Sequence, residues 1–203
     1  MTDTPAPDER WFAPLSIGDP GSLLAGRGEM AVGTEGLAWR RAGRTERRRH
    51  ADISGIRLGR QHLQGVCHAG CVLRFSDGTA VQVRNTSPAG MTDTDIEDAY
   101  RRFVLALHEA LPAHDARRIR FLRGASEGRH RVARVVASAL VTGAVGLFGW
   151  LILRNLAEAR VPWLDLLGVA AGAAVFLGVL VRHVEETRPG RYDPKRLPPD
   201  LLP

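Results

Sequence analysis

The stretch VARVVASALVTGAVGLFGWLIL, residues 132–153, contains a single charged residue, Arg134. A helix rises 1.5 Å per residue, so this stretch reaches about 33 Å and can cross a hydrocarbon core of about 30 Å. A second stretch, VPWLDLLGVAAGAAVFLGVLV at residues 161–181, has only the charge of Asp165. Because seven residues separate the two stretches, they predict an antiparallel two-helix transmembrane hairpin; a buried hairpin in a soluble protein is the alternative.

The flanks of these helices carry the excess of positive charge. Residues 115–131 hold six arginines against two acids and are predicted to form a basic juxtamembrane linker on the membrane surface. Residues 182–203, a Pro-rich tail, hold five basic residues, whereas the connector at 154–160 holds only two arginines, offset by Glu158. The positive-inside rule therefore predicts a multi-pass protein with both termini in the cytoplasm. The linker arginines are Arg117, Arg118, Arg120, Arg123, Arg129 and Arg131.

The source and the role of the hairpin are also suggested by composition. Lys195 is the only lysine among 28 basic residues, a bias typical of GC-rich bacterial genomes, so we expect a bacterial inner membrane. Neither helix carries the row of polar residues that a pore needs. Small residues allow close packing in lipid, so Gly143, Gly146, Gly168 and Gly172 are predicted to lie between the two helices; homodimerisation is the alternative.

We expect residues 11–114, which precede the linker, to form one soluble domain. Residues 1–10 are expected to be a polar, disordered N-terminus. Short strands with turn signals are expected over Glu29–Val32, Leu37–Trp39, Glu46–His50, Ile53–Gly59, Val66–Phe75 and Thr79–Thr86. A helix follows, with Thr94 and Glu97 in the pattern of a capping box. Its apolar side chains recur every three or four residues up to Leu111, and this stripe requires a sheet to cover it. The fold class is therefore α+β, with a transmembrane helical pair added.

The stretch from Gly28 to Trp39, its Arg-rich return strand and the stretch Ala51-Asp-Ile-Ser-Gly-Ile56 resemble small bacterial domains of the pleckstrin-homology-like group. The tail from Arg188 to Pro199 looks like the tails of bacterial two-helix membrane proteins that carry such a domain. The resemblance implies a bent antiparallel sheet with a C-terminal helix, and a binding or assembly role without catalytic residues. A plain small β-barrel or sandwich with an added helix is the alternative.

Two features invite a functional reading. Cys67 and Cys71, with His62 nearby, suggest a metal site, but on a strand the two cysteines lie about 13 Å apart and belong to a core stripe, so we expect no metal and no disulfide. An Arg-rich hairpin offers a surface for anionic lipid or a protein partner, with a solvated strand face as the alternative. Its arginines are Arg40, Arg41, Arg44, Arg47, Arg48 and Arg49. Trp39 is expected in the core.

The remaining motifs point to no reaction. The seven histidines have no metal-ligand spacing, and there is no Gly-rich phosphate loop or nucleophile elbow. We therefore expect no enzyme and no cofactor. Residues 1–114 carry equal numbers of basic and acidic residues, so a pI of 10.5 does not indicate a nucleic-acid-binding domain. The expected protein is a membrane-anchored binding or scaffold module, or alternatively an accessory subunit of a larger membrane enzyme or transporter.

Overall fold

The computed structural model describes residues 8–20, 25–63, 66–87, 89, 91, 93–157 and 163–203. The chain divides into two compact units, which are described separately. The first is a sheet domain that runs to Gly124 and resumes at Gly190–Pro203. The second, Ala125–Pro189, is helical. The described residues form an α+β structure with one large mixed sheet and four helices, which confirms the predicted α+β class.

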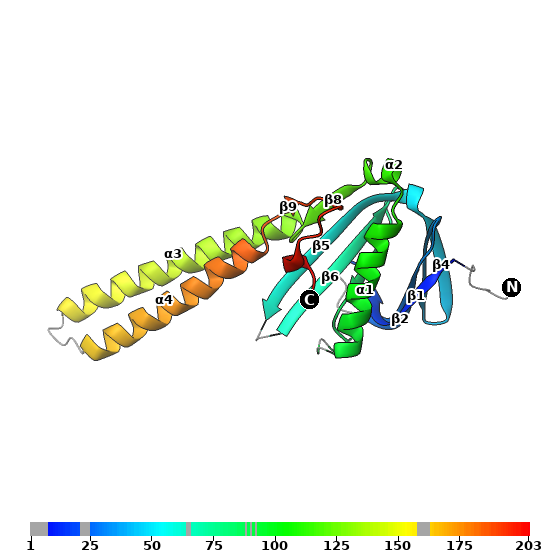
Figure 1. Ribbon diagram of the computed structural model, residues 1–203. Helices are drawn as coiled ribbons and strands as arrows, with labels where there is room; N and C mark the ends of the chain where they lie inside the picture. The colour runs from blue at the N-terminus through cyan, green and yellow to red at the C-terminus, as the bar shows by residue number, and fades with distance from the viewer. Residues whose placement is uncertain are drawn as a thin grey trace. The chain divides into compact units, whose positions relative to one another are not determined.

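The sheet has nine strands in the order β4-β3-β2-β1-β7-β6-β5-β8-β9 (Figure 1). Neighbouring strands are antiparallel except for β5 and β8, which are parallel. The strands are β1 (Arg10–Gly18), β2 (Ala25–Val32), β3 (Gly36–Arg41), β4 (Arg44–Arg49), β5 (Ile53–Leu63), β6 (Val66–Phe75), β7 (Ala80–Arg84), β8 (Arg120–Arg123) and β9 (Gly190–Arg191). The helices are α1 (Thr94–Ala110), α2 (Ala113–Ala116), α3 (Glu127–Ala157) and α4 (Trp163–Glu186), with short 3-10 turns η1 (His50–Asp52) and η2 (Pro199–Leu201).

Alternation along β6 places one set of side chains in the core. Cys71 and Leu73 are fully buried, and Ala69 and Phe75 nearly so. The prediction of a core strand over Val66–Phe75 is confirmed at both bounds. Trp39 on β3 stacks on the ring of Phe75, with centroids 5.7 Å apart, so its predicted core position is also confirmed.

Helix α1 covers the inner face of the sheet with the predicted apolar stripe (Figure 1). Its residues Ile96, Tyr100, Phe103, Val104 and Leu107 have no exposed surface. The cap differs from the prediction by one position. Asp93, not Thr94, is the N-cap, because its carboxylate accepts a hydrogen bond from the backbone N–H of Asp95 at 3.0 Å.

The prediction of a basic linker over residues 115–131 is wrong for its first half. Arg120–Arg123 forms strand β8, which pairs in parallel with β5, and Phe121 is buried in the core. The arginines of this segment suggested a solvent-exposed linker, although the segment includes a strand whose inward side chain is the aromatic Phe121. Glu127 begins α3, so only the last residues of the predicted linker lie in the helical unit.

The C-terminal segment returns to the sheet instead of forming a separate tail, so this prediction too is wrong from Gly190 onward. Strand β9 pairs with β8, and both Tyr192 and Leu201 are buried in the core. The Tyr192 hydroxyl lies 2.8 Å from Nε2 of His108 on α1, and the Tyr192 ring packs against Phe121 at 5.6 Å. Nδ1 of His108 lies 2.7 Å from the Val104 carbonyl and must donate to it, so Nε2 accepts from Tyr192.

The helical unit consists of α3 and α4, which run side by side in opposite directions (Figure 1). Within α3, His130–Arg154 is a 25-residue apolar segment with mean hydropathy 2.1 and no buried share, long and apolar enough to cross a membrane. Within the described part of α4, Ala170–Arg182 is a shorter apolar stretch. A backbone hydrogen bond of 3.0 Å from Ala125 to Thr187 joins the two ends of the unit.

Candidate interaction surface

The Arg-rich segment forms the predicted hairpin. Strands β3 and β4 pair from Gly36 opposite Arg49 to Arg41 opposite Arg44. Ala42 and Gly43 connect them with φ values of 51° and 75°. Positive φ at both positions matches the right-handed twist of the two strands, and glycine adopts it without strain. The hairpin ends at an open edge, because β4 has a strand neighbour only at β3.

Half of the hairpin arginines are bound to carboxylates of the same domain. Arg40 contacts Glu29 on β2 at 3.2 Å, and its guanidinium lies 4.9 Å from the centroid of the Trp11 ring. Arg47 is paired with Glu9, and Arg48 contacts Asp77 at 3.3 Å. These carboxylates oppose the positive field of the hairpin, so the predicted anion-binding surface is weaker than its arginine content indicates.

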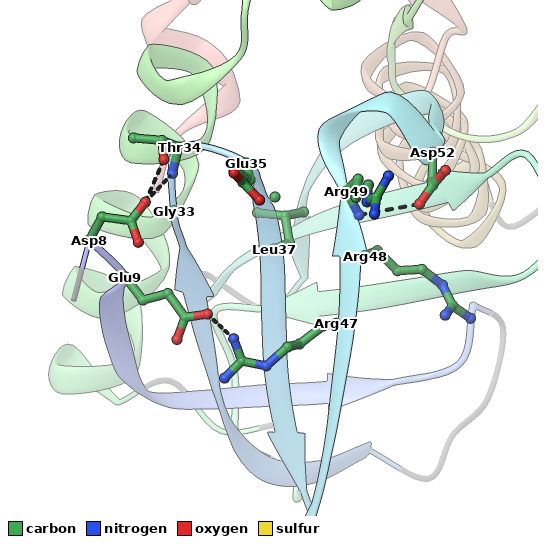
Figure 2. A pocket seen from close by; sticks show the side chains of 11 residues that line it. Asp8, Glu9, Gly33, Thr34, Glu35, Leu37, Arg47, Arg48, Arg49 and Asp52 are labelled. Carbon is green, nitrogen blue, oxygen red and sulfur yellow. Dashed lines mark hydrogen bonds and ion pairs between the residues drawn. The ribbon is translucent and has the colours of Figure 1, made fainter. Parts of the chain in front are cut away.

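A hollow of about 620 Å³ lies beside β4 and the β2–β3 turn (Figure 2). Its wall combines three arginines with four carboxylates, those of Asp8, Glu9, Glu35 and Asp52. The Asp8 carboxylate accepts hydrogen bonds from the side chain and backbone of Thr34, and these hydrogen bonds lower the pKa of Asp8. Since a phosphate entering this hollow would face several carboxylates, the hollow does not suit a strongly anionic ligand.

The cysteines lie as the core stripe predicts. Burial raises the pKa of Cys71 to about 12, so the Cys71 thiol stays protonated at neutral pH. Cys67 is half-buried and accepts a hydrogen bond from Nε of Arg60 at 3.0 Å. The side chain of His62 lies outside the described residues. Among the residues that the structure describes, no three His, Cys, Asp or Glu side chains form a group that could hold a metal ion.

The predicted membrane-surface arginines belong to both units. Arg117, Arg118, Arg120 and Arg123 lie in the sheet domain, and Arg118 donates to the Asp115 carboxylate at 2.8 Å. Arg129 and Arg131 lie in the first turns of α3. The structure therefore does not gather the six as one linker.

The prediction that four glycines pack between the helices is wrong. A Cβ built on Gly143, Gly146, Gly168 or Gly172 would meet no described atom within 4 Å. The half-buried positions lie elsewhere and recur at spacings of three and four, which marks the faces in mutual contact. On α3 they include Ala133, Ala137, Val141, Ala144 and Phe148, and on α4 Ala170, Ala173, Leu177, Leu180 and Val184. Alanine already allows close approach, and the glycines face outward.

A second basic surface, not singled out from the sequence, lies on the other half of the sheet. Strands β5 to β9 contain seven arginines and no acidic residue. Five of these arginines point away from α1, because their strand neighbours fill the core. The sequence signal was available: arginine alternates with buried apolar residues in strands without acids. The basic outer face is defined by Arg57, Arg74, Arg84, Arg120 and Arg191.

No protein-family model matches the sequence, and no curated protein matches it significantly. The chemistry of the surfaces described above is therefore the basis for a functional assignment.

Proposed function

We propose that this chain is a membrane-anchored, non-enzymatic binding module, held by α3 and α4 at the cytoplasmic face of a bacterial inner membrane. The observation that carries the proposal is the apolar segment His130–Arg154. Its Val135, Val145 and Leu147 side chains are each about 60% exposed within the chain, so water would face a continuous apolar surface. A lipid bilayer removes that cost.

The connection between the two units supports a hairpin with both flanks on one side of the membrane. Strand β8 lies four residues before α3, and β9 lies four residues after α4. Because β8 and β9 pair with each other, the chain leaves the sheet and returns to it at the same place. Both flanks then face the same compartment, and their arginines favour the cytoplasm.

The pleckstrin-homology-like assignment remains part of the proposal. Its support is the run of seven antiparallel strands, β1 to β7, followed by the amphipathic helix α1 against the core. Strands β8 and β9 are additions to that pattern. A domain of this type on a membrane anchor acts by position, since anchoring raises its effective concentration near membrane-bound partners.

The buried titratable side chains support a structural rather than a chemical role. Burial raises the pKa of Tyr100 and of Tyr192, as it does for Cys71. All three groups therefore stay protonated at neutral pH and lie in the core as neutral side chains.

Membrane extraction tests the anchor. We expect the full chain to sediment with membranes and to resist extraction by alkaline carbonate. A reporter fused after Pro203 that is active only in the periplasm should remain inactive. Release by carbonate would contradict the anchor, and an active reporter would contradict the orientation.

The outward-facing glycines favour a second candidate, an accessory subunit whose helices pack on a larger membrane enzyme or transporter. Gly143 and Gly172 leave room for another helix to approach closely. Pull-down in mild detergent should then recover one stoichiometric membrane partner, and Gly143→Ile with Gly172→Ile should reduce its recovery. Recovery of the chain alone would favour the binding module.

A further inference from the structure

We propose that the basic outer face of β5–β9 is the surface with which the sheet domain contacts anionic lipid headgroups. The inference rests on the proposed membrane anchor. It places the lipid contact on the outer face of β5–β9, whereas the sequence had suggested the β3–β4 hairpin for that contact. Five arginines carry it: Arg57, Arg74, Arg84, Arg120 and Arg191.

The register of the strands brings these arginines together from distant parts of the sequence. Gly55 on β5 stands opposite Arg120 on β8 and Arg74 on β6. Strands lie about 4.8 Å apart, so Arg120 and Arg74 flank the glycine at about 10 Å from each other. Both arginines are exposed, and no side chain rises between them. Two cations at this spacing can reach neighbouring phosphates.

The remaining members extend the positive surface in both directions. Arg57 stands opposite Leu122 on β8, and Leu122 stands opposite Arg191 on β9. Arg84 on β7 stands opposite Gly70, which in turn faces Gly59 on β5. The positive surface is thus broad. Its arginines lie on five strands, and the glycines between them have no side chain that projects from the sheet.

The absence of carboxylates distinguishes this face from the hairpin. The described strands β5 to β9 contain no Asp or Glu, whereas the hairpin arginines Arg40, Arg47 and Arg48 contact carboxylates. Asp77, in the turn between β6 and β7, is bound to Arg48 on β4. An approaching anion therefore meets carboxylates beside the hairpin arginines, whereas the strands of the outer face contribute none.

The strand pairing favours a lipid surface over an acidic peptide. Strands β5, β6, β7 and β8 are paired on both sides, so their backbone groups are not available for an added peptide strand. What they offer is side-chain charge over a broad area, which suits the mobile phosphates of a membrane. The tether is also short, because Arg123 precedes α3 by four residues.

A vesicle-binding assay on the full chain tests this assignment. The chain is placed in nanodiscs of neutral phosphatidylcholine and titrated with vesicles containing about 30% phosphatidylglycerol, at about 50 mM salt where screening is weak. An arginine near an anionic surface contributes about 1 kcal/mol, or about fivefold. We expect Arg74→Gln with Arg120→Gln to weaken vesicle binding about 25-fold.

The matched control removes the same charge from the hairpin. Arg41→Gln with Arg44→Gln should change vesicle binding by less than about twofold, since the factor of about five applies only to arginines at the contact. Equal loss with both pairs would show that net charge alone governs binding, and larger loss with the hairpin pair would place the contact there. Either result overturns the assignment, as does equal binding of the wild type to neutral vesicles.

Two further outcomes separate the alternatives. If soluble polyglutamate binds the nanodisc-held chain more tightly than the anionic vesicles do, the partner is an acidic protein and the lipid assignment fails. If the chain does not stay with nanodiscs on size-exclusion chromatography, the proposed anchor fails. The outer face is then tested by titrating the free chain with the same vesicles and variants.

Discussion

The two halves of the sheet use arginine in opposite ways. Strands β1 to β4 carry eight arginines and two acidic residues, and Arg40 and Arg47 form ion pairs with carboxylates. Strands β5 to β9 carry seven arginines and no acids. The cluster that is denser in the sequence is therefore the one in which several arginines are paired with carboxylates. The number of arginines in a segment does not locate a binding surface; the positions of the opposing carboxylates do.

The largest expected effect tests whether the C-terminal segment Gly190–Pro203 is held to the sheet domain by its core contacts. Tyr192→Ala removes a buried ring that contacts His108 and Phe121, and should lower the free energy of unfolding by about 3–4 kcal/mol. Amide hydrogen exchange of β8 peptides in the detergent-solubilised chain measures this. Tyr192→Phe keeps the ring and should cost only about 1 kcal/mol. A loss below that value for the alanine variant would mean that the segment is not held by its core contacts.

The second prediction concerns the pH dependence that His108 on α1, the partner of Tyr192, gives to the sheet domain. Burial lowers the pKa of His108, while its hydrogen bond to the Val104 carbonyl acts in the opposite direction. The unfolded chain therefore binds a proton more readily than the folded one. Stability is full above the ordinary histidine value of about 6.5 and falls as the pH drops towards the folded pKa. Thermal unfolding between pH 7.5 and 5 should show this fall, and His108→Gln should reduce it; an unchanged slope would contradict the prediction.

The third prediction applies one substitution to each half and expects opposite signs. Arg40→Gln breaks a half-exposed pair with Glu29 and should lower the free energy of unfolding by about 0.5 kcal/mol. Arg120→Gln relieves repulsion among like charges and should raise it by a few tenths of a kcal/mol. Urea unfolding at low salt measures both, and the difference should shrink at high salt. The same sign at both sites would remove the electrostatic contrast between the halves.

The smallest effect concerns Asp77 at the end of β6. Hydrogen bonds from the side chain and then the backbone of Thr79 lower the Asp77 pKa. Its contribution to stability is therefore present above the ordinary value of 3.8 and is lost as the pH falls through the lower, folded value. Thermal unfolding between pH 5 and 3 should become less steep in Asp77→Asn and in Thr79→Ala. If the pH slope changes in only one of these variants, the effect of the Asp77 carboxylate does not depend on its hydrogen bonds from Thr79, which contradicts the prediction.

Local patterns predicted much of the first half of the fold. The turn at Ala42 and Gly43, the stripe along β6 and the apolar face of α1 are each encoded within fewer than twenty residues. Periodicity detects such features because neighbouring side chains share one environment. Strand β1 was missed, since Arg10–Gly18 contains a proline and a register shift that interrupt the alternation.

Strands β8 and β9 could not be predicted from such local patterns. Strand β9 has two residues, and its pairing with β8 joins positions nearly seventy residues apart. Their charge suggested solvent-exposed segments, and the inward side chains Phe121 and Tyr192 were too few to make a pattern. The same reason explains why the basic outer face of β5–β9 was not found from the sequence, because that face exists only after five separate strands align. The prediction for the glycines of α3 and α4 was wrong because small residues indicate where a helix can be approached closely but do not indicate which helix approaches it.

The return of the last fourteen residues to the sheet also orders events during synthesis. The chain is made from the N-terminus, so both apolar helices have been synthesised before Tyr192 and Leu201 exist. Part of the core of the sheet domain, beside Phe121 and His108, therefore stays open until the helical unit has been synthesised. A chain that stops after α4 would hold the helical unit and a sheet domain whose core lacks Tyr192 and Leu201. Completion of the core by Tyr192 and Leu201 thus requires that the helical unit has already been synthesised.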